Sequence, residues 1–219
     1  LDVEEVVSTY LYRGTGAAGK TVNNGIDLSG EGGLVVFKQR NLTNNWAWID
    51  TERGTGKSIH SNDTDAQETE ADTLTSFNSN GFTVSDDNKV NTYTTTNSMD
   101  FASWTFRKAP KFFDVVTYTG NGGVQAISHN LGVAPGFIAV KQTSGSNPWM
   151  CYHRSTGATK FLELNSTAAA AVNNTAWNDT EPTSTEFTLS YGSYGNTSGQ
   201  TYVAYLFAHN DGDGEFGPD

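Results

Sequence analysis

Short apolar runs separated by polar turns recur along the whole chain and predict β-strands. The runs LVVFKQ and FIAVKQ, which begin at Leu34 and Phe137, are rich in the β-branched residues that strands favour. Apolar and polar residues alternate in WAWID and WMCYH, while DFASWTF and TYVAYLF carry an aromatic at every second or third position. Turn-forming segments such as NLTNN, NSNG, SGSNP and NTSG lie between the runs. The pattern predicts an all-β fold, although the Ala-rich residues 167–174 favour a helical turn.

The apolar pattern occurs twice, which indicates an internal repeat. GLVVFKQ matches GFIAVKQ at an offset of 103 residues (33 to 136), and further matches join YRGTG to YTGNG, GFTV to EFTL and FASWTF to YVAYLF. The offset of 103 also pairs Trp46 with Trp149, Gly54 with Gly157, Lys57 with Lys160, Asn62 with Asn165 and Thr64 with Thr167. We infer that residues 1–109 form a first module and residues 110–219 a second, with FFDVV as the first strand of the second.

Two repeated sets of short strands predict two tandem antiparallel β-sandwich modules of a jelly-roll-like kind. Aromatic residues at alternating strand positions usually fill the space between two sheets. We therefore expect Trp46, Trp104, Trp149 and Tyr205 to belong to the cores and not to form a platform for a ligand.

The composition limits the partners of the chain. Its net charge of −11 would repel a polyanion, so we expect no nucleic-acid partner. The single cysteine, Cys151, cannot form an internal disulfide and is expected to be a small buried apolar group. No apolar run approaches the length of a membrane span, and the opening LDVEEVVSTY lacks the basic start of a signal peptide. We expect no membrane insertion, and we expect the chain to be part of a longer or processed protein.

Residues 52–58 (ERGTGKS) end as a phosphate-binding loop does, but the repeat argues against a nucleotide site. Such a loop needs a glycine five residues before its Gly-Lys, where this chain has Thr51. The second copy, RSTGATK, keeps Gly157 and Lys160 but loses the glycine before the lysine. We predict that a turn glycine and the first residue of a strand are what the two copies share.

Other candidate chemistry is weak. The four histidines share no metal-ligand spacing, and none is matched by a histidine in the other copy; they are His60, His129, His153 and His209. Residues 62–65 (NDTD) and 211–215 (DGDGE) offer oxygen ligands of the kind that calcium prefers, yet neither has the full loop spacing. No nucleophile-elbow pattern occurs. We expect no catalytic residue, no metal site and no cofactor, with the acidic segments as solvated turns.

A tyrosine-containing loop, residues 190–199 (SYGSYGNTSG), is the candidate ligand-binding segment. Tyr191 and Tyr194 stand among Gly, Ser, Asn and Thr, a composition found in adaptable binding loops. A glycan or protein contact through these two residues is one interpretation. An ordinary hairpin loop with its tyrosines packed on the edge of the module is the other.

The repeat resembles a family of modules that recur in structural and tail-fibre-like proteins of marine tailed bacteriophages. The resemblance rests on long motifs over nearly the whole chain: GEGGLVVFKQR, ASWTFRKAPKFFDVVTYTG, ISHNLGVAPGFIAVKQ, YHRSTGATKFLELNSTAAAA, WNDTEPTSTEFTLS and YVAYLFAH. It implies a virion protein built from tandem β modules and brings no catalytic residues. The first copy departs from the family pattern in its acidic insert, DAQETEADTL at residues 65–74.

Three functions follow as expectations. The first is a repeat segment of a phage tail fibre or appendage on the virion surface that contacts other virion proteins, copies of itself in a homo-oligomer such as a trimer, and host surface glycans. The second is a capsid-surface decoration or head-fibre protein, for which the same modules would serve. The third and least favoured is a polysaccharide depolymerase, since no catalytic motif supports an enzyme.

Overall fold

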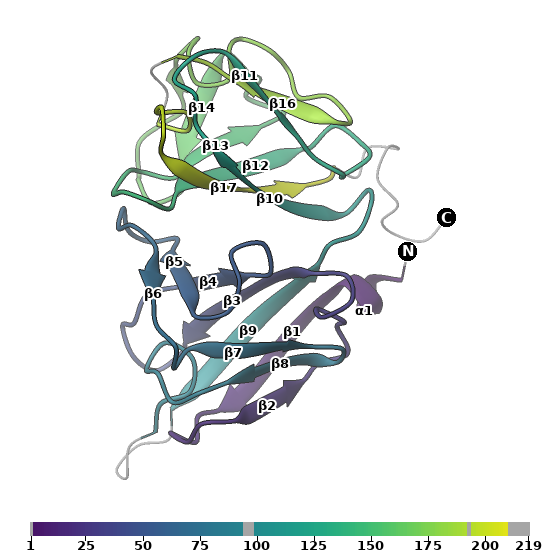
Figure 1. Ribbon diagram of the computed structural model, residues 1–219, viewed down its shortest axis with the longest axis vertical. Coiled ribbons are helices and arrows are strands. Elements are labelled where there is room, and N and C mark those ends of the chain that lie inside the picture. Colours follow the sequence, from purple (N-terminus) through teal and green to yellow (C-terminus); the bar gives the residue numbers. More distant parts are fainter. Residues whose placement is uncertain (1, 94–98, 192–193, 210–219) are drawn as a thin grey trace. The chain divides into compact units, whose positions relative to one another are not determined.

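A computed structural model describes residues 2–93, 99–191 and 194–209, in which β-strands joined by turns and loops are the dominant regular structure (Figure 1). The chain forms two compact units. Unit 1 takes in the chain up to Asn62 and Gln67–Lys108, and unit 2 takes in Asp63–Ala66 and the chain from Ala109 onward. Each unit contains antiparallel sheets, so the prediction of an all-β chain with two sandwich modules is confirmed.

Unit 1 has a six-stranded sheet and a three-stranded sheet. The larger sheet has the order β1 (Val7–Arg13), β9 (Asp100–Arg107), β3 (Gly33–Gln39), β4 (Ala47–Asp50), β5 (Lys57–His60), β6 (Glu68–Thr69). The smaller sheet has the order β2 (Lys20–Asn23), β8 (Gly81–Val84), β7 (Leu74–Asn78). A short helix that the pattern did not predict, α1 (Val3–Val6), precedes β1, and the Asp2 side chain caps it by accepting a hydrogen bond from the Glu4 backbone N–H.

Unit 2 repeats the larger sheet strand by strand, whereas its smaller sheet has two strands in the place of three. Its larger sheet has the order β10 (Phe113–Thr119), β17 (Thr201–Phe207), β12 (Phe137–Gln142), β13 (Met150–His153), β14 (Lys160–Glu163), β15 (Ala171–Val172). Its smaller sheet pairs β11 (Gln125–Ser128) with β16 (Glu186–Leu189). The helical turn predicted for residues 167–174 is wrong, because Ala171 and Val172 pair with Phe161 and Lys160 of β14. Pairing to a sheet edge has overridden the helical preference of alanine.

The core of each unit lies between its larger and smaller sheets. In unit 1, Phe37 of β3 meets Phe82 of β8 edge to face, with ring centroids 5.2 Å apart. In unit 2, Trp177 packs edge to face against Tyr152 and Phe187. Each fully buried side chain of this size contributes about 1.5–3 kcal/mol to folding.

The four aromatics predicted to lie in the cores differ in burial. None belongs to either core cluster, because the neighbouring strand positions face the smaller sheet instead. Trp149 and Tyr205 are buried, whereas Trp46 is 37% exposed and stacks on the half-buried Trp104. The prediction of a core position is therefore confirmed for Trp149 and Tyr205 and wrong for Trp46, although neither buried residue belongs to the cluster between the two sheets.

Each unit contains one buried asparagine, Asn91 or Asn196, that bonds two backbone groups of a distant turn; we call this arrangement the asparagine clamp. The Asn91 side chain, which is fully buried, accepts a hydrogen bond from the Thr15 N–H and donates one to the Ala17 carbonyl. Asn196 does the same in unit 2, accepting from the Asn121 N–H and donating to the Gly123 carbonyl. Each asparagine thus ties a turn outside the sheets to the body of its unit through a fully buried side chain.

A tyrosine and a glycine accompany each clamp. The Tyr12 hydroxyl donates to the Val90 carbonyl, and the Tyr118 hydroxyl donates to the Gly195 carbonyl. The chain also approaches a carbonyl closely at Gly14, where a Cβ atom would lie 2.0 Å from the Thr92 oxygen. At Gly120 of unit 2 the corresponding contact, with the Thr197 oxygen, would be 2.4 Å. The repeat therefore preserves the buried polar bonds of the module as well as its strands.

Candidate functional site

A polar pocket opens in unit 1 at the edge of the larger sheet. Its volume is about 240 Å³, and every residue that lines it is polar. Three stretches of chain contribute: the loop between β3 and β4, the β5–β6 hairpin, and the segment that follows β8. The lining residues are Thr43, Asn44, Asn45, His60, Glu68, Asn88 and Lys89. The pocket thus brings together residues that are remote in sequence.

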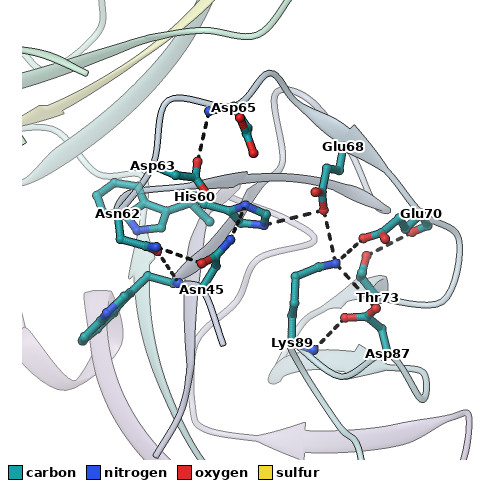
Figure 2. Close-up of polar contacts among 12 residues, drawn as sticks. Asn45, His60, Asn62, Asp63, Asp65, Glu68, Glu70, Thr73, Asp87 and Lys89 are labelled. Atoms are coloured by element: carbon teal, nitrogen blue, oxygen red, sulfur yellow. Dashed lines mark hydrogen bonds and ion pairs between the residues drawn. The ribbon is translucent and has the colours of Figure 1, made fainter. Parts of the chain in front are cut away.

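One wall of the pocket is a network of ion pairs around Lys89 (Figure 2). The ammonium nitrogen lies 2.6 Å from Glu70 Oε2, 3.2 Å from Glu68 Oε2 and 3.6 Å from Asp87 Oδ2. Burial alone would lower the pKa of Lys89, but the hydrogen bond that its ammonium donates to Glu70 and the charges of Asp87 and Glu68 together raise it. Lys89 is therefore protonated, and its charge is paired with carboxylates of its own unit.

The opposite wall is a chain of hydrogen bonds whose direction is fixed by one backbone group (Figure 2). The Trp46 N–H can only donate, so its partner in Asn62 is the Oδ1 atom, 2.9 Å away. The Asn62 Nδ2 then donates to Asn45 Oδ1 at 2.8 Å, which turns the Asn45 Nδ2 toward His60 Nδ1 at 3.1 Å.

The tautomer of His60 follows from this chain. Because an amide NH₂ only donates, Nδ1 of His60 accepts, and the ring proton of the neutral imidazole lies on Nε2. That nitrogen faces Glu68 Oε2 at 3.7 Å. The backbone of Trp46 therefore orients a proton toward the carboxylate that also contacts Lys89.

Several polar groups of the pocket remain open toward solvent. Among the residues that the structure describes, the side chains of Thr43 and Asn88 make no hydrogen bond to the protein. The Asn44 Nδ2 donates to Gln39 Oε1 and to the Asn88 carbonyl, which leaves its Oδ1 free to accept. Both ion pairs of Glu68 use Oε2. The open set contains a hydroxyl, an amide and acceptor oxygens.

Unit 2 has different chemistry at the equivalent place. The Ser58–Glu68 pair of β5 and β6 corresponds by the repeat to the Phe161–Ala171 pair of β14 and β15. Lys89 follows the last residue of β8 by five positions, and Tyr194 follows the last residue of β16 by five. Where Lys89 contacts Glu70, Tyr194 contacts Phe161 edge to face at 6.3 Å. The same corner of the module is charged in unit 1 and aromatic in unit 2.

The structure separates the two tyrosines proposed as binding residues. Tyr191 is 73% exposed, whereas Tyr194 is 45% exposed and packs against Phe161. Residues 192 and 193, between them, lie outside the described residues. Tyr194, but not Tyr191, therefore occupies the position that corresponds to the unit 1 pocket.

The ERGTGKS segment is a strand connection in both units. Gly54 and Gly157 adopt positive φ angles, +92° and +71°, that favour glycine in turns. Lys57 and Lys160 are the first residues of β5 and β14. The prediction of a shared turn glycine and strand start is confirmed.

The four histidines differ in burial. His60 and His129 are buried, and His153 and His209 are half-buried. In residues 62–65, Asn62 turns toward Asn45, and Asp63 Oδ1 accepts from the Asp65 N–H (Figure 2). Within the described part of the chain, no three His, Cys, Asp or Glu side chains gather as metal ligands. Residues 211–215 lie outside that part.

Sequence reasoning did not find the pocket. Two signals were present: His60 has no histidine counterpart in the second copy, and the acidic insert at residues 65–74 interrupts the family pattern. The insert supplies Glu68 and Glu70 to the network around Lys89. Polar residues that the two copies do not share therefore indicated the site, but only the structure shows that these residues lie close together.

The fold and the repeated clamps define a class, that of tandem β-sandwich proteins built from two copies of one module. The chain belongs to the family described as Domain of unknown function (DUF7483), whose model matches residues 3–218. No curated protein and no solved structure matches the chain. In the described residues, no helix has both the length and the apolar character needed to cross a bilayer.

Proposed function

We propose that this chain is a repeat segment of a bacteriophage tail fibre or appendage, exposed on the virion surface, that contacts host surface glycans. The likeness of its motifs to tail-fibre-like phage modules supports the virion setting. Tandem modules with matching buried clamps suit an extended appendage, because each module has a core of its own. A net charge of −11 argues against a role in contacting the genome.

The observation that carries the glycan contact is the polar pocket of unit 1. Its open hydroxyl, amide and carboxylate groups can both donate and accept hydrogen bonds, as the hydroxyl groups of a sugar do. Small-molecule sites combine concavity with a few convergent polar groups that set specificity. The pocket has both properties.

Capsid-surface decoration is the second candidate, because the same modules would serve on a head. Immunogold labelling of purified particles with an antibody against residues 1–219 distinguishes the two. Label on tails or fibre tips supports the proposal, and label over the head favours decoration. Particles without label contradict both virion assignments.

Self-association is part of the proposal, with a trimer as the expected form for a fibre. β1 is an edge strand of the larger sheet, and among the described residues it pairs only with β9. Its Leu11 and Tyr10 side chains are 59% and 38% exposed. Open edges of this kind favour pairing with another chain. Light scattering of the purified protein tests this, and a monomer at every concentration would contradict it.

Binding without turnover separates this function from a depolymerase. Glu68 is the one carboxylate among the residues that line the pocket, whereas glycoside hydrolysis generally needs a pair of carboxyl groups. We expect capsular polysaccharide to keep its viscosity during incubation with the protein. A steady fall in viscosity would favour the enzyme instead.

A further inference from the structure

We infer that the unit 1 pocket binds one uncharged, hydroxyl-rich ring of a glycan and excludes the corresponding carboxylated sugar. This inference rests on the proposed glycan contact and adds the site and the class of ligand. Charge, hydrogen-bonding groups and size each lead to it.

The charge of the pocket disfavours an anion. Lys89 is the only cationic side chain in the lining apart from the titratable His60. Its ammonium faces Glu68, Glu70 and Asp87, so three carboxylates surround one positive charge. An incoming carboxylate would gain no free cation and would meet excess negative charge. A lysine in a pocket often marks an anion site, but this lysine is already neutralised.

The open groups match hydroxyls. The Thr43 hydroxyl donates or accepts, the Asn88 amide does both, and Asn44 Oδ1 accepts. Sugar hydroxyls also donate and accept at one atom, so each can pair with any of these groups. A purely cationic ligand would leave the Asn88 amide donors without an acceptor, which is costly where water is displaced.

The wall formed by the hydrogen-bond chain from Trp46 to His60 gives the pocket a defined shape before any ligand binds. The Trp46 N–H orients Asn62, Asn62 orients Asn45, and Asn45 sets the tautomer of His60. The Nε2 atom of His60 then lies 3.7 Å from Glu68 Oε2, on the side of the carboxylate that Lys89 also contacts. His60 and Asn45 are thus positioning residues, and pre-orientation of this kind reduces the entropy lost on binding.

The volume limits the ligand to a small unit. Sites for drug-sized ligands measure roughly 300–1,000 Å³, and this pocket, at about 240 Å³, is smaller. One ring of a glycan fits that scale, with the rest of the chain in solvent. Affinity for a single sugar would accordingly be weak, with Kd on the order of millimolar.

Paired sugars that differ only in charge test the ligand class. The full chain, labelled with ¹⁵N, is titrated separately with glucose, galactose and N-acetylglucosamine, with glucuronic and galacturonic acid, and with glucosamine. We expect at least one neutral sugar to shift the amide signals of residues 43–45 and 88–89 saturably, and to bind at least fivefold more tightly than its uronic acid. Tighter binding of a uronic acid or of glucosamine would overturn the neutral assignment.

Variants test the site. Asn88→Ala should weaken neutral-sugar binding by about tenfold, the typical scale of a lost hydrogen bond, while Asn174→Ala, at an exposed asparagine of unit 2, should leave it unchanged. Glu70→Gln, outside the lining, should free part of the Lys89 charge and raise uronic-acid affinity severalfold. Saturable binding that Asn88→Ala does not alter would overturn the pocket, and unchanged exclusion in Glu70→Gln would overturn the charge argument.

The outcomes also separate this inference from the proposed function. Sugar binding that maps to other residues removes the pocket but leaves a glycan-contacting protein. Absence of binding to every sugar removes the pocket and the glycan contact, whereas tail labelling by immunogold would still support the appendage. Label over the head together with shifts at residues 43–45 and 88–89 would keep the pocket and remove the fibre.

Discussion

In unit 1 the segment after β8 is held by Lys89, whose ammonium contacts Glu70 and Glu68, whereas in unit 2 the segment after β16 is held by Tyr194, whose ring contacts Phe161. Two residues further on, both segments carry the same buried asparagine with the same backbone partners. A fully buried asparagine side chain must keep its hydrogen-bond partners in both copies, which restricts change at that position. Partly exposed contacts can be replaced by any chemistry that holds the segment, and there the copies have diverged.

A second difference lies in the turn after β4 and β13. In unit 1, Arg53 is buried and its Nε donates to Asp50 Oδ2 at 2.6 Å, while a terminal nitrogen donates to the Trp48 carbonyl. The equivalent residues of unit 2 are His153 and Thr156, and the Thr156 hydroxyl donates to the His153 carbonyl. A buried ion pair thus replaces a neutral hydrogen bond at one position of the repeat.

The largest effect is expected from Arg53→Met. Asp50 would remain buried without its cation, which typically costs about 3–5 kcal/mol. Urea unfolding combined with hydrogen exchange resolved for each unit should show the loss in unit 1 only. The matched change in unit 2, Thr156→Met, should cost about 0.5–1.5 kcal/mol. Equal losses from the two changes would contradict the difference drawn between these turns.

The shared clamps should give effects of equal size. Asn91→Ala and Asn196→Ala each remove a fully buried side chain and its two hydrogen bonds to the backbone, which is expected to cost about 1–3 kcal/mol. The same unit-resolved urea experiment measures both. If one substitution proves nearly harmless, the two asparagines do not perform the same task.

Lys89→Met and Tyr194→Ala compare the two ways of holding the segment. Loss of the ammonium should cost about 1–2 kcal/mol, less than for a fully buried pair, because Glu68 and Glu70 are 40% and 35% exposed. Loss of the aromatic contact should cost about 0.5–1.5 kcal/mol. Raising NaCl to about 1 M should shrink the first effect and leave the second unchanged, because salt screens charges and not ring contacts.

Alkaline pH sharpens the same contrast. The raised pKa of Lys89 means that the folded state holds this proton more tightly than the unfolded state. The stability that it contributes is full below about 10.5, the ordinary lysine pKa, and is lost as pH rises further. Urea midpoints of the wild type and Lys89→Met should therefore converge above that pH. A constant gap would argue against the ion pairs as the cause.

The smallest effect concerns Cys151, which reports on unit 2 because it is the single cysteine of the chain. Burial raises the pKa of its thiol to about 12, from an ordinary value of 9.0. The folded state therefore favours the neutral thiol, and the stability that this contributes is full below pH 9 and is lost as pH rises toward 12. At pH 8 we expect an aromatic disulfide reagent to react with Cys151 only as unit 2 unfolds. Rapid reaction in the absence of urea would show that β13 opens independently.

The sequence predicted the strands because their signals are local. LVVFKQ covers all of β3 except its first residue, Gly33, and TYVAYLF matches β17 residue for residue, since alternation and β-branching act within a few positions. The two-residue strands β6 and β15 carry no such signal and exist only through pairing with β5 and β14. Residues 167–174 were misassigned for that reason.

The site was less predictable because it depends on distant residues. Asn45, His60 and Lys89 come from three segments, and no spacing rule joins them. Alternation also does not tell which side of a strand faces the smaller sheet, so Trp46 was placed in a core that Ala47 and Ile49 occupy. The repeat itself held the best clue, in the polar residues that the two copies do not share.

The pairing of first and last strands has a mechanical consequence for each unit. In unit 1, Val7 at the start of β1 lies opposite Phe106 at the end of β9, and in unit 2, Phe113 lies opposite Phe207. The chain therefore enters and leaves each sheet at the same end. Tension applied along the chain would open this ladder one bonded pair at a time, the geometry of unzipping and not of shear. Single-molecule stretching of the chain should therefore show low opening forces for both modules.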